Sequence, residues 1–304
     1  MTAKPEQGQA RRSRRGDMNP AVGLPRDDVE RRSSRGEIFR RMLQHPRYLF
    51  RPWIPIVKAV EGEVFARQRL LPPVLDVACG DGIFAWATYG QALDVGVDLD
   101  ARELPEAARL AAYRHLAVAD ARALPFPAGS FQSLTSVCAV EHMDGLSTVL
   151  HELSRVLAPG GRLFMTVPSD QFGDLLLASR IWRALGCPAR AAAYGARKNA
   201  RSHHVNVLST AAWNEVLGAA SLRVVESTHL LSPRVMTLWS LATSSPFKLA
   251  FLPFRLVRDR EWLWVERLLR CILLAGVVPF LDRAPARDAS VGGYLFLTAE
   301  KSRT

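Results

Sequence analysis

One segment, VLDVACGDGIFA over residues 74–85, constrains the fold more than any other part of the chain. An apolar run breaks at Gly80 and Gly82 and then resumes, which is the pattern of a buried strand, a tight turn and a helix. Glycine lets the backbone turn sharply and lie close to a ligand, because it has no side chain. The segment therefore predicts the first strand–turn–helix unit of an α/β fold, with a ligand at the turn.

The same alternation of strand and helix continues along the chain. Further strands are expected at 94–100, 115–120, 133–138, 162–168, 222–231 and 292–301. Helices are expected between them, at 83–90, 103–113, 145–157 and 209–221. Alternation of this kind predicts a doubly wound, mostly parallel, Rossmann-like sheet with helices on both faces.

Composition separates this core from flanking segments. Residues 1–35 are basic and poor in large apolar residues, so we expect a disordered tail, and residues 36–72 predict one or two helices that cap the domain. The rest divides into core 73–231 with an insertion at 170–205, an apolar and basic insertion at 232–289, and core again at 290–304. The two insertions are expected to be helical and to form a lid.

The formal net charge is +11, and it is unevenly placed. Residues 73–170 carry six Lys or Arg against twelve Asp or Glu, so the centre is acidic and the flanks carry the positive charge. An anionic partner, such as a membrane surface, is therefore expected to contact the flanks.

Cysteine usage and the N-terminus indicate the compartment. The four cysteines form no C-x-x-C pair and have no nearby histidine, so we expect neither disulfides nor a zinc site, and we predict no metal ligands. The N-terminus lacks the apolar region of a secretory signal, which predicts a cytoplasmic protein.

Two aspartates suggest which ligand the glycine turn binds. Asp98 lies 16 residues after Gly82, at the end of the second expected strand, where ribose hydroxyls need an acceptor; Asp100 is a second candidate. The glycine turn and Asp98 are compatible with both a nicotinamide dinucleotide and S-adenosylmethionine. Asp76, four residues before Gly80, would repel a pyrophosphate and attract the ammonium group of S-adenosylmethionine.

Three more motifs follow at compact spacing: ADARALPFPAGSF (119–131), SVCAVEHM (136–143) and LSRVLAPGGRLFMTVP (153–168). Asp120 ends the third expected strand, where it can accept a hydrogen bond from an adenine amino group. Together with the glycine turn, these motifs resemble the class I S-adenosylmethionine-dependent methyltransferases, specifically the methyltransferase type 11 group. The resemblance is strong over about 70–170 and looser over 203–231 and 292–301.

The resemblance implies S-adenosyl-L-methionine as cofactor and a seven-stranded sheet whose last strand pair is antiparallel. It implies contacts to the methionine part from Asp76, Gly80 and Gly82, to the ribose side from Asp98 and Leu99, to adenine from Asp120 and Ala121, and to the sulfonium side from Val137 and Cys138. The sequence departs from the group at Gln132, where aspartate is usual; this position begins a strand and leaves the cofactor site intact.

Polar residues after the fourth strand are candidates for catalysis. Methyl transfer mainly requires alignment, and it needs a base only where the acceptor is a weak nucleophile such as a hydroxyl. His142 is the candidate base, with Glu141 beside it; alternatively, the two residues fix the turn by hydrogen bonds. His203 and His204 either project over the pocket from the first insertion or face solvent beside a helix.

The insertions are expected to select the acceptor. Residues 180–201 carry six basic residues and no acidic one, which fits either a receptor for phosphate or carboxylate or a solvated helix face. Residues 235–257 and 261–281 are apolar and aromatic, but charged residues interrupt both, so no transmembrane helix is expected. This composition fits a membrane-interface segment, or equally a lid or a dimer contact.

The sequence thus predicts a methyltransferase that acts on a small-molecule or lipid-linked acceptor, such as a quinone, an isoprenoid or a glycolipid precursor. It would lie in the cytoplasm or peripherally on the inner face of the membrane. The alternatives are an NAD-dependent oxidoreductase and a catalytically silent cofactor-fold partner protein. Nucleic acid is disfavoured as acceptor because no NPPY-like or DPPY-like motif follows the fourth strand. The oligomeric state stays open.

Overall fold

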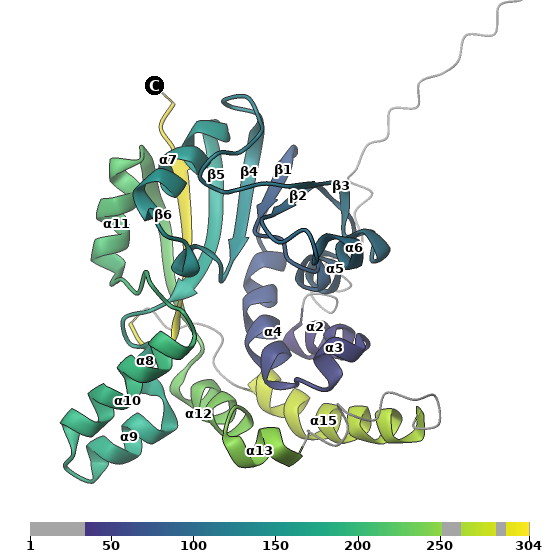
Figure 1. Ribbon diagram of the computed structural model, residues 1–304, viewed down its shortest axis with the longest axis vertical. Coiled ribbons are helices and arrows are strands. Elements are labelled where there is room, and N and C mark those ends of the chain that lie inside the picture. Colours follow the sequence, from purple (N-terminus) through teal and green to yellow (C-terminus); the bar gives the residue numbers. More distant parts are fainter. Residues whose placement is uncertain (1–33, 251–262, 284–289, 304) are drawn as a thin grey trace, which may run out of the picture.

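The centre of the fold is a seven-stranded sheet with the strand order β3-β2-β1-β4-β5-β7-β6 (Figure 1). The computed structural model describes residues 34–250, 263–283 and 290–303. The strands are β1 (Val74–Val77), β2 (Leu93–Asp98), β3 (Tyr113–Val118), β4 (Phe131–Val137), β5 (Leu157–Pro168), β6 (Leu222–Leu230) and β7 (Tyr294–Lys301). Strands β1 to β5 pair in parallel, whereas β7 is antiparallel to both β5 and β6. The predicted mostly parallel sheet with an antiparallel last pair is confirmed.

Helices cover both faces of this sheet. They are α4 (Trp53–Ala66), α5 (Ile83–Tyr89), α6 (Leu104–Arg109), α7 (Leu146–Val156) and α11 (Thr210–Ala219). Successive side chains of a strand point to opposite faces. In β5, Phe164 therefore lies in the core formed with α4 and α5, whereas Leu163 and Met165 lie in the core formed with α7 and α11.

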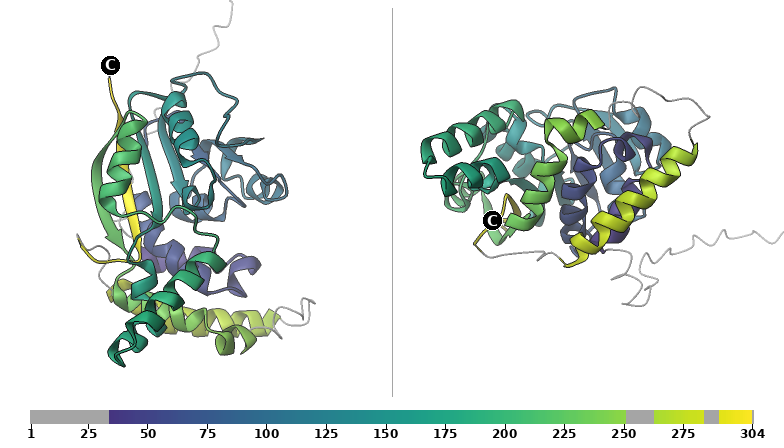
Figure 2. Two further views of the ribbon diagram at one scale, coloured as in Figure 1. Left: turned by 60° about the vertical axis from the view of Figure 1, so that its left-hand side comes forward. Right: turned by 90° about the horizontal axis from the view of Figure 1, so that it is seen from below.

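A layer of further helices lies beyond the carboxyl ends of the parallel strands (Figures 1 and 2). It contains α8 (Phe172–Leu175), α9 (Leu177–Ala184), α10 (Pro188–Arg201), α12 (Pro233–Ala242), α13 (Ser245–Ala250) and α15 (Leu263–Arg283). All of them come from the two insertions expected at 170–205 and 232–289, of which 251–262 and 284–289 lie outside the described residues. The helical character of the insertions is thus as expected where the structure describes them.

The N-terminal cap contains more helices than expected. Besides α4 it forms α2 (Arg35–Met42) and α3 (Pro46–Leu49), because Pro46 has no backbone N–H to continue the first helix. The side chain of Ser34 caps α2 by accepting a hydrogen bond from the backbone of Glu37. Ser34 and Arg35 therefore belong to this cap, and the rest of the expected tail lies outside the described residues.

Several element ends differ from the sequence expectations, and three of them bear on the site or the sheet. Helix α6 stops at Arg109, and β3 ends at Val118, so Asp120 follows that strand and makes an isolated bridge with Ala123. Strand β5 begins at Leu157, before the expected 162, with a register shift against β4. Among the described residues, no helix combines the length and apolar character needed to cross a membrane.

Candidate active site

A cleft of about 230 Å³ lies at the carboxyl ends of β1, β2 and β3, next to the turn after β4. This is where open α/β sheets bind their ligands. Its lining includes five residues that the sequence analysis assigned to the site: Asp98, Leu99, Asp120, Ala121 and His142. Leu99 is 66% exposed. An apolar side chain left open in a cleft offers a surface that a bound ring can cover.

The two glycines of the turn after β1 serve different purposes. Gly80 has φ +55°, and a Cβ atom there would meet no other atom within 4 Å, so the residue leaves open space for a ligand. Gly82 has φ +71°, and its Cβ would lie 2.9 Å from Cα and Cβ of Ala107 in α6. The absence of a side chain at Gly82 therefore makes room for α6, and the predicted cofactor contacts of both glycines stay predictions.

Asp98 holds the glycine turn against the end of β2. Its carboxylate accepts hydrogen bonds from the backbone N–H groups of Gly80 and Asp100, both at 2.8 Å. Asp100, the second candidate for the ribose, pairs with Arg102, whose hydrogen bonds lower the pKa of Asp100 to about 2. Asp98 is thus the acidic residue that the fold places beside the open turn.

Asp76 lies beneath the turn, outside the cleft lining. It is 5% exposed, and its two oxygens accept hydrogen bonds from the hydroxyls of Tyr113 (2.6 Å) and Thr135 (2.8 Å). Burial raises the pKa of Asp76 to about 6, although both hydrogen bonds act in the opposite direction. Any attraction to a cofactor ammonium would act through the charge of this residue, because its oxygens already have partners.

Asp120 lines the cleft, but its carboxylate is already engaged. Arg122 donates to it through its backbone N–H (2.9 Å) and through its guanidinium (2.6 Å), and these bonds lower the pKa of Asp120 to about 2. From the sequence, Asp120 is expected to accept a hydrogen bond from an adenine amino group. The nearby Arg122 makes this expectation incomplete, because the two side chains form a local ion pair.

Three candidate catalytic residues come together beside the cleft: Glu141, His142 and His204. Glu141 and His142 lie in the short helix η1 (Val140–His142), and His204 follows α10. Glu141 is fully buried, neither of its oxygens has a hydrogen-bond partner, and burial raises its pKa to about 8. Burial also lowers the pKa of His204 to about 4. The prediction of no metal ligands did not consider this group, because His204 lies 62 residues after His142 in the chain.

His203, the fourth candidate, contributes its backbone. Its carbonyl accepts a hydrogen bond from Nδ1 of His142 at 2.9 Å, and its φ of +54° turns the chain at this point. The backbone N–H groups of Val205 and Asn206 then donate to the carbonyl of Glu141. The loop after α10 is thereby fastened to η1, which brings His204 to Glu141 and His142.

A buried polar cluster next to this group was not foreseen. Lys58 lies 3.1 Å from Glu61, and Sγ of Cys138 donates to Glu61 at 2.7 Å. Cys138 and Val137, predicted to line the sulfonium side, are not among the residues that line the cleft. The signal available in the sequence was the occurrence of Lys58, Glu61 and Glu63 within an otherwise apolar helix, WIPIVKAVEGEVFA.

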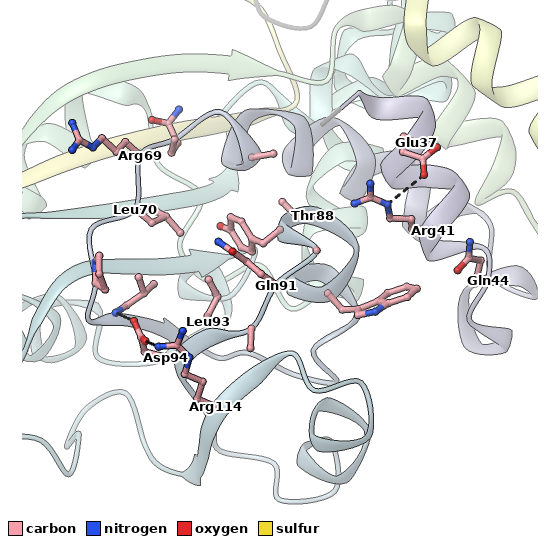
Figure 3. A pocket seen from close by; sticks show the side chains of 18 residues that line it. Glu37, Arg41, Gln44, Arg69, Leu70, Thr88, Gln91, Leu93, Asp94 and Arg114 are labelled. Atoms are coloured by element: carbon pink, nitrogen blue, oxygen red, sulfur yellow. Dashed lines mark hydrogen bonds and ion pairs between the residues drawn. The ribbon is translucent and has the colours of Figure 1, made fainter. Parts of the chain in front are cut away.

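A larger pocket, of about 1000 Å³, lies elsewhere (Figure 3). It runs from α2 to the amino ends of β1 and β2, opposite to the end at which such sheets bind ligands. Among its charged side chains, Arg41 pairs with Glu37, and Arg114 pairs with Asp94 (2.8 Å). The smaller cleft is therefore the candidate active site despite its size.

Comparison with known proteins supports this choice. Residues 75–165 match the family model described as a methyltransferase domain. The chain is 34% identical over 177 residues to the malonyl-[acyl-carrier protein] O-methyltransferase of Erwinia billingiae, covering 55% of this chain and 69% of that one. It is 40% identical over 119 residues to the demethylmenaquinone methyltransferase of Thermus thermophilus, covering 36% of this chain and 54% of that one.

A solved structure agrees on the fold. The SAM-dependent methyltransferase of Thermotoga maritima superposes with a TM-score of 0.53 at 14% identity, over 87% of this chain and 99% of that one. The turn at Gly80 is open, Leu99 is exposed in the cleft and Asp98 is anchored beside both. The contacts of Gly80 with the methionine part and of Asp98 and Leu99 with the ribose side stay predictions. The comparisons favour a methyl donor over the nicotinamide dinucleotide that the glycine pattern alone left open.

Proposed function

Because this chain belongs to the class I S-adenosylmethionine-dependent methyltransferases of the type 11 group, we propose that it methylates a lipid-linked acceptor at a membrane surface. A quinone, an isoprenoid or a glycolipid precursor has the required chemistry. When bound, S-adenosylmethionine supplies a methyl group on a positively charged sulfur, which is a good leaving group. The chain's own residues have to bind the acceptor, align it and exclude water.

The observation that carries the proposal is an apolar stripe along the outer side of α15. Trp264, Leu268 and Ile272 are 63%, 52% and 60% exposed. They follow one another at intervals of four residues, so they lie on one side of the helix. Leu269 and Leu273 are buried on the other side, where α15 packs on α2. A contiguous exposed apolar surface of this kind is typical of an interaction site.

The charge around this stripe favours an anionic membrane over a second protein chain. Residues 233–289 carry nine Lys or Arg against five Asp or Glu. Of these, Arg267 and Lys248 are exposed on α15 and α13. Helices with an exposed apolar side and flanking cations bind membrane interfaces, with the apolar residues among the lipid headgroups. The proposed membrane face is part of the helical layer beyond the carboxyl ends of the strands, which is the end of the sheet where the cleft lies (Figure 1).

Activation of the acceptor would fall to the cluster of Glu141, His142 and His204. Nδ1 of His142 is bonded to the carbonyl of His203, and its Nε2 lies 3.7 Å from Glu141. His142 is also part of the cleft lining. It would therefore brace the turn with Nδ1, which leaves Nε2 for the activation of an acceptor hydroxyl.

A second candidate function follows from the Erwinia relative, whose printed name specifies a malonyl group on an acyl-carrier protein. A carboxylate acceptor needs no base, and residues 180–201 would supply positive charge for it. Several of these side chains are already engaged: Arg180 donates to Thr237 at 2.9 Å, and Arg183 pairs with Asp174 at 2.8 Å. The exposed stripe on α15 has no role in this alternative.

Flotation with vesicles tests the proposal. The wild-type chain should float with phosphatidylglycerol vesicles at low salt and less with phosphatidylcholine vesicles, because both apolar burial and charge contribute. The double variant Leu268→Glu/Ile272→Glu should stay at the bottom. Val225→Glu, which changes a 40% exposed residue on β6 far from α15, should float like the wild type.

Two further measurements separate the possible failures. Calorimetric binding of S-adenosylhomocysteine should be equal in the wild type and the double variant, because α15 does not line the cleft. Transfer of labelled methyl groups into a lipid extract, compared with malonyl-[acyl-carrier protein], identifies the acceptor. A wild-type chain that binds S-adenosylhomocysteine but never floats, and that labels only the malonyl compound, would overturn the lipid proposal in favour of the alternative.

A further inference from the structure

The cluster beside the cleft has an unusual deficit of hydrogen bonds. Glu141 is 0% exposed, and both of its carboxylate oxygens lack a hydrogen-bond partner. A buried carboxylate without partners is strongly unfavourable, so such groups are normally paired or bound to a cation. Nε2 of His142 lies 3.7 Å from Oε1 of Glu141, beyond hydrogen-bond distance, and the charge of Lys58 acts on Glu141 without a hydrogen bond.

His142 and His204 carry their ring hydrogens on the same nitrogen, Nδ1. Nδ1 of His142 lies 2.9 Å from the carbonyl oxygen of His203, and Nδ1 of His204 lies 3.0 Å from the amide oxygen Oδ1 of Asn199. A carbonyl oxygen can only accept, so each Nδ1 carries the hydrogen. In a neutral imidazole Nε2 then has the lone pair. A hydrogen bond from the second ring nitrogen to an oxygen is what orients histidines that bind metals.

We propose that Glu141, His142 and His204 hold a divalent cation of the zinc class, with a further coordination position open to the cleft. The proposal rests on the proposed methyltransferase function and states how the acceptor is activated. Ligand atoms of the three residues lie within 4.8 Å of one another. Around a tetrahedral zinc with bonds of about 2.0–2.2 Å, ligand atoms are about 3.3–3.6 Å apart, so a small closing movement of the side chains completes the site.

The backbone holds these ligands in place. Asn206 donates through its side-chain amide to the carbonyls of Val140 (2.9 Å) and Met143 (2.8 Å), on either side of Glu141 and His142. Together with the two backbone bonds to the carbonyl of Glu141, this fastens the loop of His204 to η1 at four points. A site with two histidines, one glutamate and an open position is the kind that supports catalysis, because an exchangeable ligand can enter.

The cation would act on the acceptor oxygen. A hydroxyl bound at the open position loses its proton to water more easily, because the positive charge stabilises the resulting oxyanion. That oxygen then forms the new bond to the methyl carbon, while the carbon–sulfur bond breaks and its electron pair remains on sulfur. In this arrangement Nε2 of His142 binds the cation and is not itself the base.

Metal titration of the untagged, chelator-treated full chain tests the site. Zinc should bind with a stoichiometry of one in competition with a chromophoric chelator. Cobalt should give the visible absorption of a four-coordinate or five-coordinate ion. Glu141→Gln and His204→Gln should each weaken zinc binding by about 100-fold or more, and Asn199→Ala, which frees the His204 ring, by about 10- to 100-fold. Glu141→Gln keeps the size of the side chain and removes a buried charge, so this variant should fold.

The control is His151→Gln. His151 lies on α7 and bonds to the carbonyl of Ser147 in its own helix, away from the cluster, so its loss should leave zinc affinity unchanged. Zinc affinity that survives both Glu141→Gln and His204→Gln would overturn the proposal, as would no zinc binding by the wild type. Calorimetric binding of S-adenosylhomocysteine is measured on the same samples. If it persists while zinc does not bind, the metal site fails alone; if both are absent, the proposed function fails too.

Discussion

The two glycines of the turn after β1 provide a test in which equal chemical changes should have unequal effects. In Gly82→Ala, the new Cβ would lie 2.9 Å from the backbone Cα of Ala107, at a φ of +71°. A left-handed conformation costs a non-glycine residue about 1–2 kcal/mol, and overpacking adds about 1–3 kcal/mol. The lower entropy of the unfolded alanine chain offsets about 0.4–1 kcal/mol of this. The expected net loss of folding free energy is thus about 2–4 kcal/mol.

In Gly80→Ala only the conformational cost applies to folding, because nothing lies within 4 Å of the new Cβ. The expected loss of stability is about 1 kcal/mol after the same offset. The new methyl group instead occupies space beside Asp98 that we assign to the ligand. Affinity for S-adenosylhomocysteine should therefore fall about tenfold or more, equivalent to about 1.4 kcal/mol.

Urea unfolding and thermal unfolding without ligand measure the first effect, and calorimetric titration measures the second. Gly82→Ala should lower Tm by about 5–15 °C and Gly80→Ala by about 2–4 °C, at about 2–4 °C per kcal/mol for a domain of this size. Gly82→Ala should bind the ligand nearly normally below its Tm. Equal destabilisation by the two changes, or loss of affinity in Gly82→Ala alone, would refute the reasoning.

Two further predictions concern buried charges. Burial raises the pKa of Asp76 from 3.8 to about 6, so the folded state holds the proton more tightly and stability falls as pH rises from about 4 to about 6. Asp76→Asn should remove this pH-dependent loss of about 3 kcal/mol of folding free energy. Urea unfolding of both proteins from pH 4 to 8 measures it, and equal dependence of the folding free energy on pH would contradict the prediction. Arg35, which pairs with Glu63 and donates to the carbonyl of Leu281 at 2.9 Å, ties α15 to the N-terminal cap. Arg35→Met should cost about 3 kcal/mol in urea unfolding, partly restored by Glu63→Gln, and a loss below about 1 kcal/mol would argue against this anchor.

The sequence determined the core of the fold and the place of the site. Strands and helices in α/β proteins are specified by local periodicity and by glycine turns, so the residues themselves carry the information. The alternation from Val74 onward predicted the parallel sheet, and Gly80 and Asp98 predicted a ligand site at the ends of β1 and β2, where the structure brings these two residues into contact. The sequence also predicted helices in both insertions.

Contacts between segments far apart in the chain were decided only by the tertiary structure. Gly82 is required by α6, whose Ala107 lies outside the motif that contains this glycine. His204 reaches Glu141 because the backbone of the loop after α10 bonds to η1. Backbone N–H groups are common to nearly all residues and leave no pattern of side chains in the sequence. Local sequence patterns therefore determine which residues lie at the ends of the strands. The way in which the insertions fold back onto the sheet determines which of these residues come into contact.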